Sequence, residues 1–418
     1  MRRVLMLHYY FPPLGGMGSV RVVKIASQLP QVGWMPMVVS PRSGPDVYDP
    51  SLVAPEACVV RTAQLRLRRA GAGLVPPAVA RAPGRGHPAA GVRALVHRWL
   101  YRPDPQIGWY PFALRAARRA LREHPADAIF SSSCPITAHL VARALHRETR
   151  LPWIAEFRDL WTDASPHDGR RLEAVVALER ALIRQATGVV TVSDTWMDLF
   201  QSRGARRVWT LTNGFDPREF AAEIAPRRLT ATYVGTYYPD RQDMHTAIAA
   251  LGALARERPY SSLTLRFVGE LPPALPAALA THGLGARVDY TGFVPHTDCV
   301  REMMASTVLL VPGPVTDERP ELRGNIAGKT FECLATRRPI LFVGAPDSDA
   351  ARLLRPFARV RIVAPGDVEG AKAALRSILA DPAPPSGEDL EPFTHRALAA
   401  RLARILSTAC TDQRDSVW

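Results

Sequence analysis

The sequence has little lysine for so basic a chain. Of 418 residues, 53 are lysine or arginine, and only Lys24, Lys329 and Lys372 are lysines. The net charge of +14 therefore reflects an arginine-, alanine- and proline-rich composition, as GC-rich coding produces, and no RNA- or DNA-binding signature accompanies it. We expect no nucleic-acid partner.

Paired cysteines and long apolar runs are also missing. The five scattered cysteines form no CxxC pair and no metal-ligand spacing, so we expect neither a disulfide framework nor a metal site. No run of about 18 apolar residues could span a bilayer. The first apolar stretch, residues 4–8, is too short for a signal peptide, and we expect a cytoplasmic protein.

Short β-branched runs alternate with helical patterns along the chain, which predicts α/β layers over mostly parallel sheets. At about 100–200 residues per domain, the length suggests two domains. Strands are expected at residues 4–8, 37–40, 128–131, 153–156, 188–192, 230–234, 263–268, 288–290, 307–311, 339–343 and 360–363. The Asn-Gly and Asp-Pro pairs in 213–217 are typical of turns and linkers and indicate the boundary between these domains. We expect domains at 1–215 and 216–393, with a final helix, about 394–418, packing back on the first.

The segment most informative about function is residues 324–335, Gly-Asn-Ile-Ala-Gly-Lys-Thr-Phe-Glu-Cys-Leu-Ala. Lys329 and Thr330 follow glycines at a helix start, so a cation and backbone N–H groups should meet at one point, which suits a diphosphate. Glu332, one turn on, can accept hydrogen bonds from two ribose hydroxyls. The pattern predicts a sugar-nucleotide site, although an ordinary helix start is the alternative.

Two stretches of the first half add to this. The loop in 11–21 is glycine-rich, and Gly16 and Gly18 leave room for a ligand to approach the backbone, although turns of this kind are also common without a ligand. Residues 61–102 interleave arginines with apolar residues, which suits a membrane surface, yet four prolines would break a continuous amphipathic helix. Peripheral membrane contact therefore stays open beside a surface loop.

In this order the motifs resemble the GT-B glycosyltransferases of family 4 over nearly the whole chain. The resemblance implies two facing Rossmann-like domains with parallel sheets and a deep cleft between them. It further implies a retaining, metal-independent transferase that uses a nucleoside-diphosphate sugar as co-substrate and needs no other cofactor.

The resemblance also implies site residues. Catalytic roles fall on His139, Asp159, Lys329 and Arg241. Donor-binding roles fall on Gly16, Gly18, Thr236, Gly269, Val294, Asn325, Ile326, Ala327, Gly328, Thr330 and Glu332. Acceptor-side roles fall on Arg21, Asp104, Trp109, Arg158 and Trp161. The alternatives are a structural His139, an Arg158–Asp159 ion pair and a solvated Arg241.

One position departs from the family pattern, in which two glutamates stand eight positions apart. Gly324 occupies the first, so Asn325 or backbone amides of 324–326 would hydrogen-bond the sugar. We expect a small polar acceptor, such as an aminocyclitol or a thiol-bearing metabolite, in bacterial antibiotic or secondary-metabolite biosynthesis. A lipid-linked polysaccharide precursor, a sugar-nucleotide epimerase and a non-catalytic regulatory subunit are the alternatives.

Overall fold

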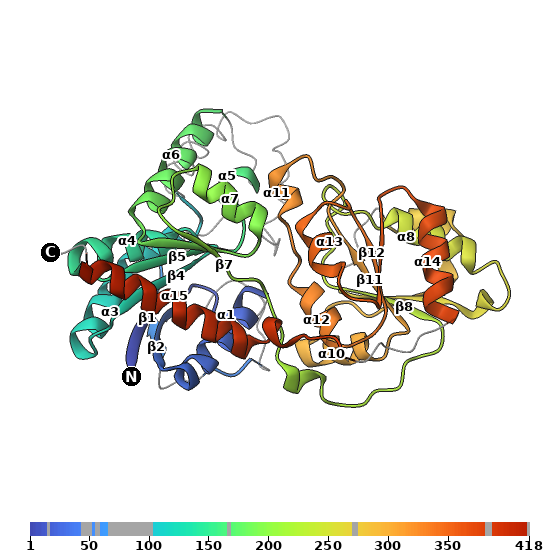
Figure 1. The fold of residues 1–418 in the computed structure, drawn as a ribbon, viewed down its shortest axis with the longest axis horizontal. Helices are drawn as coiled ribbons and strands as arrows, with labels where there is room; N and C mark the ends of the chain where they lie inside the picture. Colours follow the sequence, from blue (N-terminus) through green and yellow to red (C-terminus); the bar gives the residue numbers. More distant parts are fainter. Residues whose placement is uncertain are drawn as a thin grey trace.

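The computed structural model describes residues 1–14, 17–42, 52–54, 59–65, 103–164, 169–269, 275–380 and 387–415. Two lobes lie side by side, each built on one parallel sheet (Figure 1). Gly16 and most of the 61–102 stretch, from residue 66 onward, lie outside the described residues.

The N-terminal lobe carries a seven-stranded sheet in the order β3-β2-β1-β4-β5-β6-β7. Its strands are β1 (Arg2–Leu7), β2 (Trp34–Pro41), β3 (Val59–Thr62), β4 (Ala128–Ser133), β5 (Trp153–Phe157), β6 (Gly188–Thr191) and β7 (Val208–Thr210). Its helices are α1 (Met17–Gln28), α3 (Tyr110–Glu123), α4 (Thr137–Thr149), α5 (Trp161–Ala164), α6 (Gly169–Gln185) and α7 (Asp194–Ser202), with short 3-10 turns η1 (Leu29–Val32) and η3 (Ile107–Trp109). The strand order reverses between β1 and β4, and ligands of such sheets bind beyond the carboxyl ends of the strands at this point.

The C-terminal lobe repeats the plan with six strands in the order β10-β9-β8-β11-β12-β13. These are β8 (Thr230–Val234), β9 (Thr264–Val268), β10 (Val288–Tyr290), β11 (Val308–Pro312), β12 (Ile340–Val343) and β13 (Val360–Val363). The helices are α8 (His245–Leu254), α9 (Leu275–Thr281), α10 (His296–Met304), α11 (Pro320–Arg323), α12 (Lys329–Ala335), α13 (Asp349–Leu354) and α14 (Val368–Ala380), with 3-10 turns η5 (Tyr260–Ser262), η6 (Gly285–Arg287) and η7 (Glu391–Phe393). Here the order reverses between β8 and β11.

The last helix, α15 (His395–Asp415), starts beside the C-terminal lobe and runs across the N-terminal one (Figure 1). Its buried Leu398, Leu402 and Leu406 join one apolar cluster with Val20 and Val23 of α1. A fully buried leucine contributes about 1.5–3 kcal/mol, so this face holds the end of the chain on the first lobe.

All eleven strands expected from the sequence are present, and the fold class is confirmed. Two strands, β3 and β7, were not predicted. Both are short sheet edges with partly exposed side chains, so their apolar pattern is weak.

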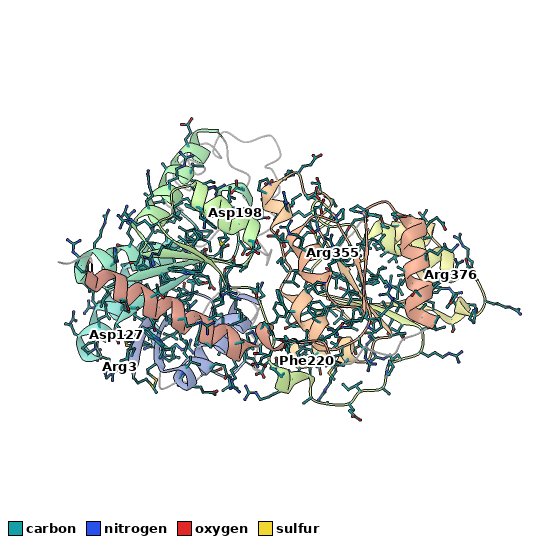
Figure 2. The ribbon with its side chains drawn as sticks, in the orientation of Figure 1. Arg3, Asp127, Asp198, Phe220, Arg355 and Arg376 are labelled. Atoms are coloured by element: carbon teal, nitrogen blue, oxygen red, sulfur yellow. The ribbon has the colours of Figure 1, made fainter. Side chains whose placement is uncertain are left out.

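The chain crosses between the lobes twice, and the two crossings are bonded to each other. Phe215 N–H donates to the Phe393 carbonyl at 3.1 Å, and His395 N–H donates to the Phe215 carbonyl at 2.9 Å. The turn η4 (Pro217–Phe220) follows the first crossing, and its Phe220 lies below the start of α15 (Figure 2). Within the described ranges, no helix is long and apolar enough to cross a membrane.

Candidate functional site

Lys329 begins α12 and reaches the carboxyl end of β8. Its Nζ lies 3.8 Å from the ring centroid of Tyr233, and a Cβ built on Gly235 would be 3.8 Å from it. This Nζ is buried and has no hydrogen-bond partner among the residues that the structure describes. Burial lowers the pKa of Lys329 to about 7. An unpaired buried amine is costly, so the site favours an anion beside it.

The backbone at the start of α12 adds less than the sequence suggested. The N–H groups of Thr330 and Phe331 already donate to the carbonyls of Ala327 and Gly328, at 3.0 and 3.2 Å. The helix has only seven residues. The predicted attraction for phosphate therefore rests mainly on the Lys329 amine rather than on free N–H groups.

Glu332 lies one turn further along α12 and is buried. Its Oε1 is 3.7 Å from Nε2 of His296, the first residue of α10. Burial raises the pKa of Glu332 to about 7, and His296 counteracts part of that rise. The carboxylate is thus close to its ionisation point at neutral pH.

Glycines shape the sheet edge beside Lys329. Gly235 and Gly269 end β8 and β9 with φ angles of +102° and +132°, and a Cβ on Gly269 would lie 2.5 Å from the Gly235 carbonyl oxygen. Gly269 N–H donates to the Gly292 carbonyl at 3.0 Å, which draws the segment before Val294 to the same edge. These two positions require glycine because side chains rarely adopt such φ values.

The remaining predicted donor residues surround this edge in two loops. Thr236 and Arg241 are exposed in the loop between β8 and α8, and the Arg241 carbonyl accepts from Val315 N–H at 3.0 Å. Val294, before α10, is partly buried. The segment before α12 supplies the partly exposed Asn325, Ala327 and Gly328 and the buried Ile326, and Thr330 is buried in the first turn of α12. The structure thus brings the predicted donor residues of the C-terminal lobe to one side of its sheet.

Gly324 has a neighbour that the sequence could not indicate. A Cβ at this position would lie 2.3 Å from Cδ1 of Trp196 and 2.9 Å from Oγ of Ser193, both in the N-terminal lobe. Trp196 Nε1 donates to the Pro320 carbonyl at 3.1 Å. Space for a larger side chain at 324, such as the glutamate of the family pattern, is therefore taken by α7.

In the N-terminal lobe, Arg158 lies beside Gly18, at the start of α1. A Cβ on Gly18 would be 2.7 Å from Nη1 of Arg158, and Arg158 Nε donates to the Ser133 carbonyl at 2.9 Å. No Arg158–Asp159 ion pair is among the described interactions, and Asp159 is exposed. These two residues remain accessible positions after β5.

Arg21 is buried, whereas its predicted acceptor-side role needs an accessible side chain. It is 4% exposed, and its Nη2 lies 2.9 Å from Oε1 of Glu156 and 2.8 Å from the Leu211 carbonyl oxygen. Ser132 donates to the other Glu156 oxygen at 2.6 Å. Arg21 thus joins α1 and β5 to the start of the linker, as a buried structural ion pair.

Asp104, Trp109 and Trp161, also predicted on the acceptor side, are held within the domain. Asp104 accepts from Thr137 N–H at 2.8 Å and from Thr137 Oγ1 at 2.7 Å, and so caps α4. Trp109 is fully buried, with Nε1 donating to Thr62 Oγ1 at 2.8 Å. Trp161 is 7% exposed. In this conformation none of the three offers an open surface to an acceptor.

His139, in the first turn of α4, is fully buried. Trp153 Nε1 donates to Ser131 Oγ at 2.8 Å, and Ser131 Oγ lies 2.8 Å from His139 Nδ1. Burial lowers the pKa of His139 to about 3. A sugar would reach Nε2 only after neighbouring segments move.

A pocket of about 450 Å³ opens between the lobes. Its lining comes from α7, including Asp198, which is labelled in Figure 2, and from Pro320, Arg323 and Arg352 of the C-terminal lobe. The sequence motifs indicated a role neither for these residues nor for His296, Tyr233 or Lys24. Lys24 and Lys329 are two of the three lysines in the chain, so the scarcity of lysine could have drawn attention to Lys24.

Comparison with known proteins agrees with this architecture. Residues 15–214 match a glycosyl transferase 4-like domain, and residues 228–381 match the glycosyl transferases group 1. A 2-deoxystreptamine glucosyltransferase of Streptomyces kanamyceticus is 26% identical over 230 residues, 50% of this chain and 56% of that protein. The chain thus matches little more than half the length of this relative.

Solved structures share the fold at low identity. Sucrose-phosphate synthase from Thermosynechococcus elongatus has a TM-score of 0.60 and 15% identity, covering 100% of this chain and 98% of the other. AviGT4, a glycosyltransferase involved in avilamycin A biosynthesis, has a TM-score of 0.56 and 12% identity, covering 98% of each chain. The two domain matches and the two-lobed fold place the chain in the GT4-like, group 1 family of GT-B glycosyltransferases, enzymes that use a nucleotide-sugar donor and an acceptor substrate.

Proposed function

We propose that this protein is a retaining glycosyltransferase that moves a sugar from a nucleoside-diphosphate sugar to a small polar acceptor in antibiotic or other secondary-metabolite biosynthesis. Binding of the nucleotide-sugar donor is supported by the Lys329 amine, which is buried at the end of β8 without a hydrogen-bond partner among the described residues. A diphosphate beside it would pair this charge, and Glu332, one turn away, would accept the ribose hydroxyls.

In this proposal the bond between the anomeric carbon and the diphosphate oxygen breaks while the acceptor atom bonds to the same face of that carbon. The acceptor proton passes to the departing phosphate oxygen, so no protein nucleophile is needed. Lys329 stabilises the charge that develops on the leaving group, with help from Arg241 and backbone amides near Gly18. Because cationic side chains supply this stabilisation, we expect activity to persist in EDTA.

On the acceptor side we propose that the exposed Asp159 positions the incoming group and that Arg158, next to Gly18, lies beside it. His139 remains a proposed positioning residue, on the condition that the segments covering it move. A small polar acceptor is supported by the name of the Streptomyces relative, which acts on 2-deoxystreptamine.

Two measurements test the proposal in turn. In a thermal-shift panel of UDP, GDP, ADP and dTDP, one nucleotide at about 100 times its dissociation constant should stabilise the fold by about 2.7 kcal/mol. The matching nucleotide sugar should then be hydrolysed slowly without acceptor, and its sugar transferred with retention to an aminocyclitol. An altered sugar released without acceptor would indicate an epimerase, and transfer only to a polyprenyl-linked acceptor would overturn the small-acceptor proposal.

A further inference from the structure

A largely buried cluster of charged side chains, in which Lys24 and Glu219 are partly exposed, connects the proposed ribose carboxylate to the N-terminal lobe. Its members come from four elements: Glu332 from α12, His296 from α10, Glu219 from η4 and Lys24 from α1. α10 and α12 lie close to the start of α15, where the chain crosses between the lobes (Figure 1). The proposed catalytic groups do not include His296, Glu219 or Lys24.

His296 occupies the middle of this cluster. Its Nε2 lies 3.5 Å from Oε2 of Glu219 and 3.7 Å from Oε1 of Glu332, and the imidazole is 10% exposed. Lys24 continues the chain of charges, because its Nζ lies 2.7 Å from the other Glu219 oxygen and 3.4 Å from Asp216. One imidazole nitrogen thus stands between two carboxylates from different parts of the fold.

The charges explain why a histidine at this place matters for Glu332. Burial favours the protonated acid, which accepts hydrogen bonds less well than the carboxylate does. A positive charge on His296 opposes that effect. Burial also disfavours the imidazolium, but Glu219 and Glu332 outweigh it, so the pKa of His296 lies above its ordinary value. Lys24 partly neutralises Glu219 on the far side and limits its repulsion of Glu332.

We propose that His296 is the positioning residue of the donor site, which holds Glu332 as an oriented carboxylate for the ribose hydroxyls and ties it through Glu219 and Lys24 to α1. The inference rests on the proposed function, in which Glu332 binds the ribose. It adds a residue that acts through Glu332 and touches neither the diphosphate nor the sugar.

The test compares a nucleoside diphosphate with its 2′,3′-dideoxy analogue, which lacks both hydroxyls that Glu332 would accept. The probe is whichever of UDP, GDP or ADP binds the wild-type protein, with affinities measured by calorimetry. His296→Gln should weaken ribonucleotide binding about tenfold and leave the dideoxy analogue within about twofold, since only the hydroxyl contact depends on Glu332. His245→Gln, an exposed histidine at the start of α8, is the matched control and should change neither affinity.

A double variant separates positioning from a general structural effect. If His296 acts through Glu332, His296→Gln combined with Glu332→Gln should bind the ribonucleotide no more weakly than Glu332→Gln alone. Additive losses, or an equal loss for the dideoxy analogue, would overturn the inference.

Folding is controlled separately, by the thermal melting of each free protein. If His296→Gln does not fold, Glu219→Gln takes its place, because Glu219 is the other carboxylate beside the imidazole. The same two affinities, for the ribonucleotide and its dideoxy analogue, are then measured. Glu219→Gln should weaken ribonucleotide binding by about threefold and spare the dideoxy analogue. A wild-type protein that binds none of UDP, GDP, ADP and dTDP would overturn the proposed function and this inference together. Binding of dTDP alone, or ribonucleotide binding that is unaffected by these variants, overturns the inference alone.

Discussion

At the scale of the residue, Lys329 shows how a functional group can work against the stability of the free protein. Its amine is buried beside Tyr233 without a hydrogen-bond partner among the described residues. A methionine of similar shape would keep the apolar packing and remove the unpaired cation. The unpaired amine therefore favours the proposed diphosphate site over an ordinary helix start.

Lys329→Met should therefore reduce transfer activity by about 10²–10³-fold, since it removes a cation from the leaving diphosphate. The melting temperature of the free protein should stay the same or rise. The control is Lys372→Met, since Lys372 lies on α14 and its Nζ pairs with Glu257 Oε1 at 2.9 Å. This variant should have near-normal activity. Near-normal turnover by Lys329→Met would remove Lys329 from the site.

Lys329 and Glu332 together predict how nucleotide affinity depends on pH. Both groups have a pKa of about 7, lowered for the amine and raised for the carboxyl by burial. A bound diphosphate favours the protonated amine, so affinity should fall as the pH rises above 7. Ribose hydroxyls favour the ionised carboxylate, so affinity should also fall as the pH drops below 7.

Calorimetry between pH 5.5 and about 8.5 should thus give a maximum near neutrality, with limiting slopes of about tenfold per pH unit. Glu332→Gln should flatten the acid limb, and Lys329→Met the alkaline limb. A wild-type profile that is flat across this range would contradict both assignments.

At the scale of the element, the sequence predicted what is local and missed what the fold brings together. Buried strands such as β11 and β12 are continuous apolar runs, so their pattern identifies them. The edge strands β3 and β7 are short and have few buried side chains, so they show no such apolar run. The start of α12 at Lys329 was confirmed, because glycines and a helical pattern mark it within a few residues.

The contact of Gly324 with Trp196 could not be predicted, because it joins segments that are remote in sequence and lie in different lobes. The same applies to His296, whose partners Glu219 and Glu332 come from separate elements. Asp104 and Trp109 were given acceptor roles from their motif, but the motif cannot show that one caps α4 and the other fills the core.

Gly324 gives a prediction at this scale. In Gly324→Ala the new Cβ would lie 2.3 Å from Cδ1 of Trp196, so α7 must shift or the segment before α12 must move. Overpacking of this kind costs about 1–3 kcal/mol, and the melting temperature should fall. Gly285→Ala is the control, because the nearest neighbour of its Cβ is 3.8 Å away. A Gly324→Ala protein that melts like the wild type would show that the two lobes do not pack there in solution.

At the scale of the whole molecule, two sets of contacts join the lobes. One is the pair of chain crossings around Phe215 and Phe393, next to the charged cluster of Lys24, Glu219, His296 and Glu332. The other is the contact of α7 with α11 and α13. Asp349, which is buried, accepts from Thr195 N–H at 2.8 Å and from Thr195 Oγ1 at 2.7 Å, and so binds the first turn of α7 from the opposite lobe.

The two chain crossings are covalent and keep the lobes connected at one end. The hydrogen bonds between α7 and Asp349 are not covalent, so we expect them to break when the lobes move apart. Asp349→Ala removes both hydrogen bonds and should raise the radius of gyration measured by small-angle scattering. Transfer should slow more than nucleotide binding, because Lys329 and Glu332, proposed to bind the donor, lie in one lobe while Arg158 and Asp159, proposed for the acceptor, lie in the other. Asp347→Ala, an exposed carboxylate two residues earlier, is the matched control. A scattering curve and a transfer rate that match the wild type would show that this contact does not hold the lobes together.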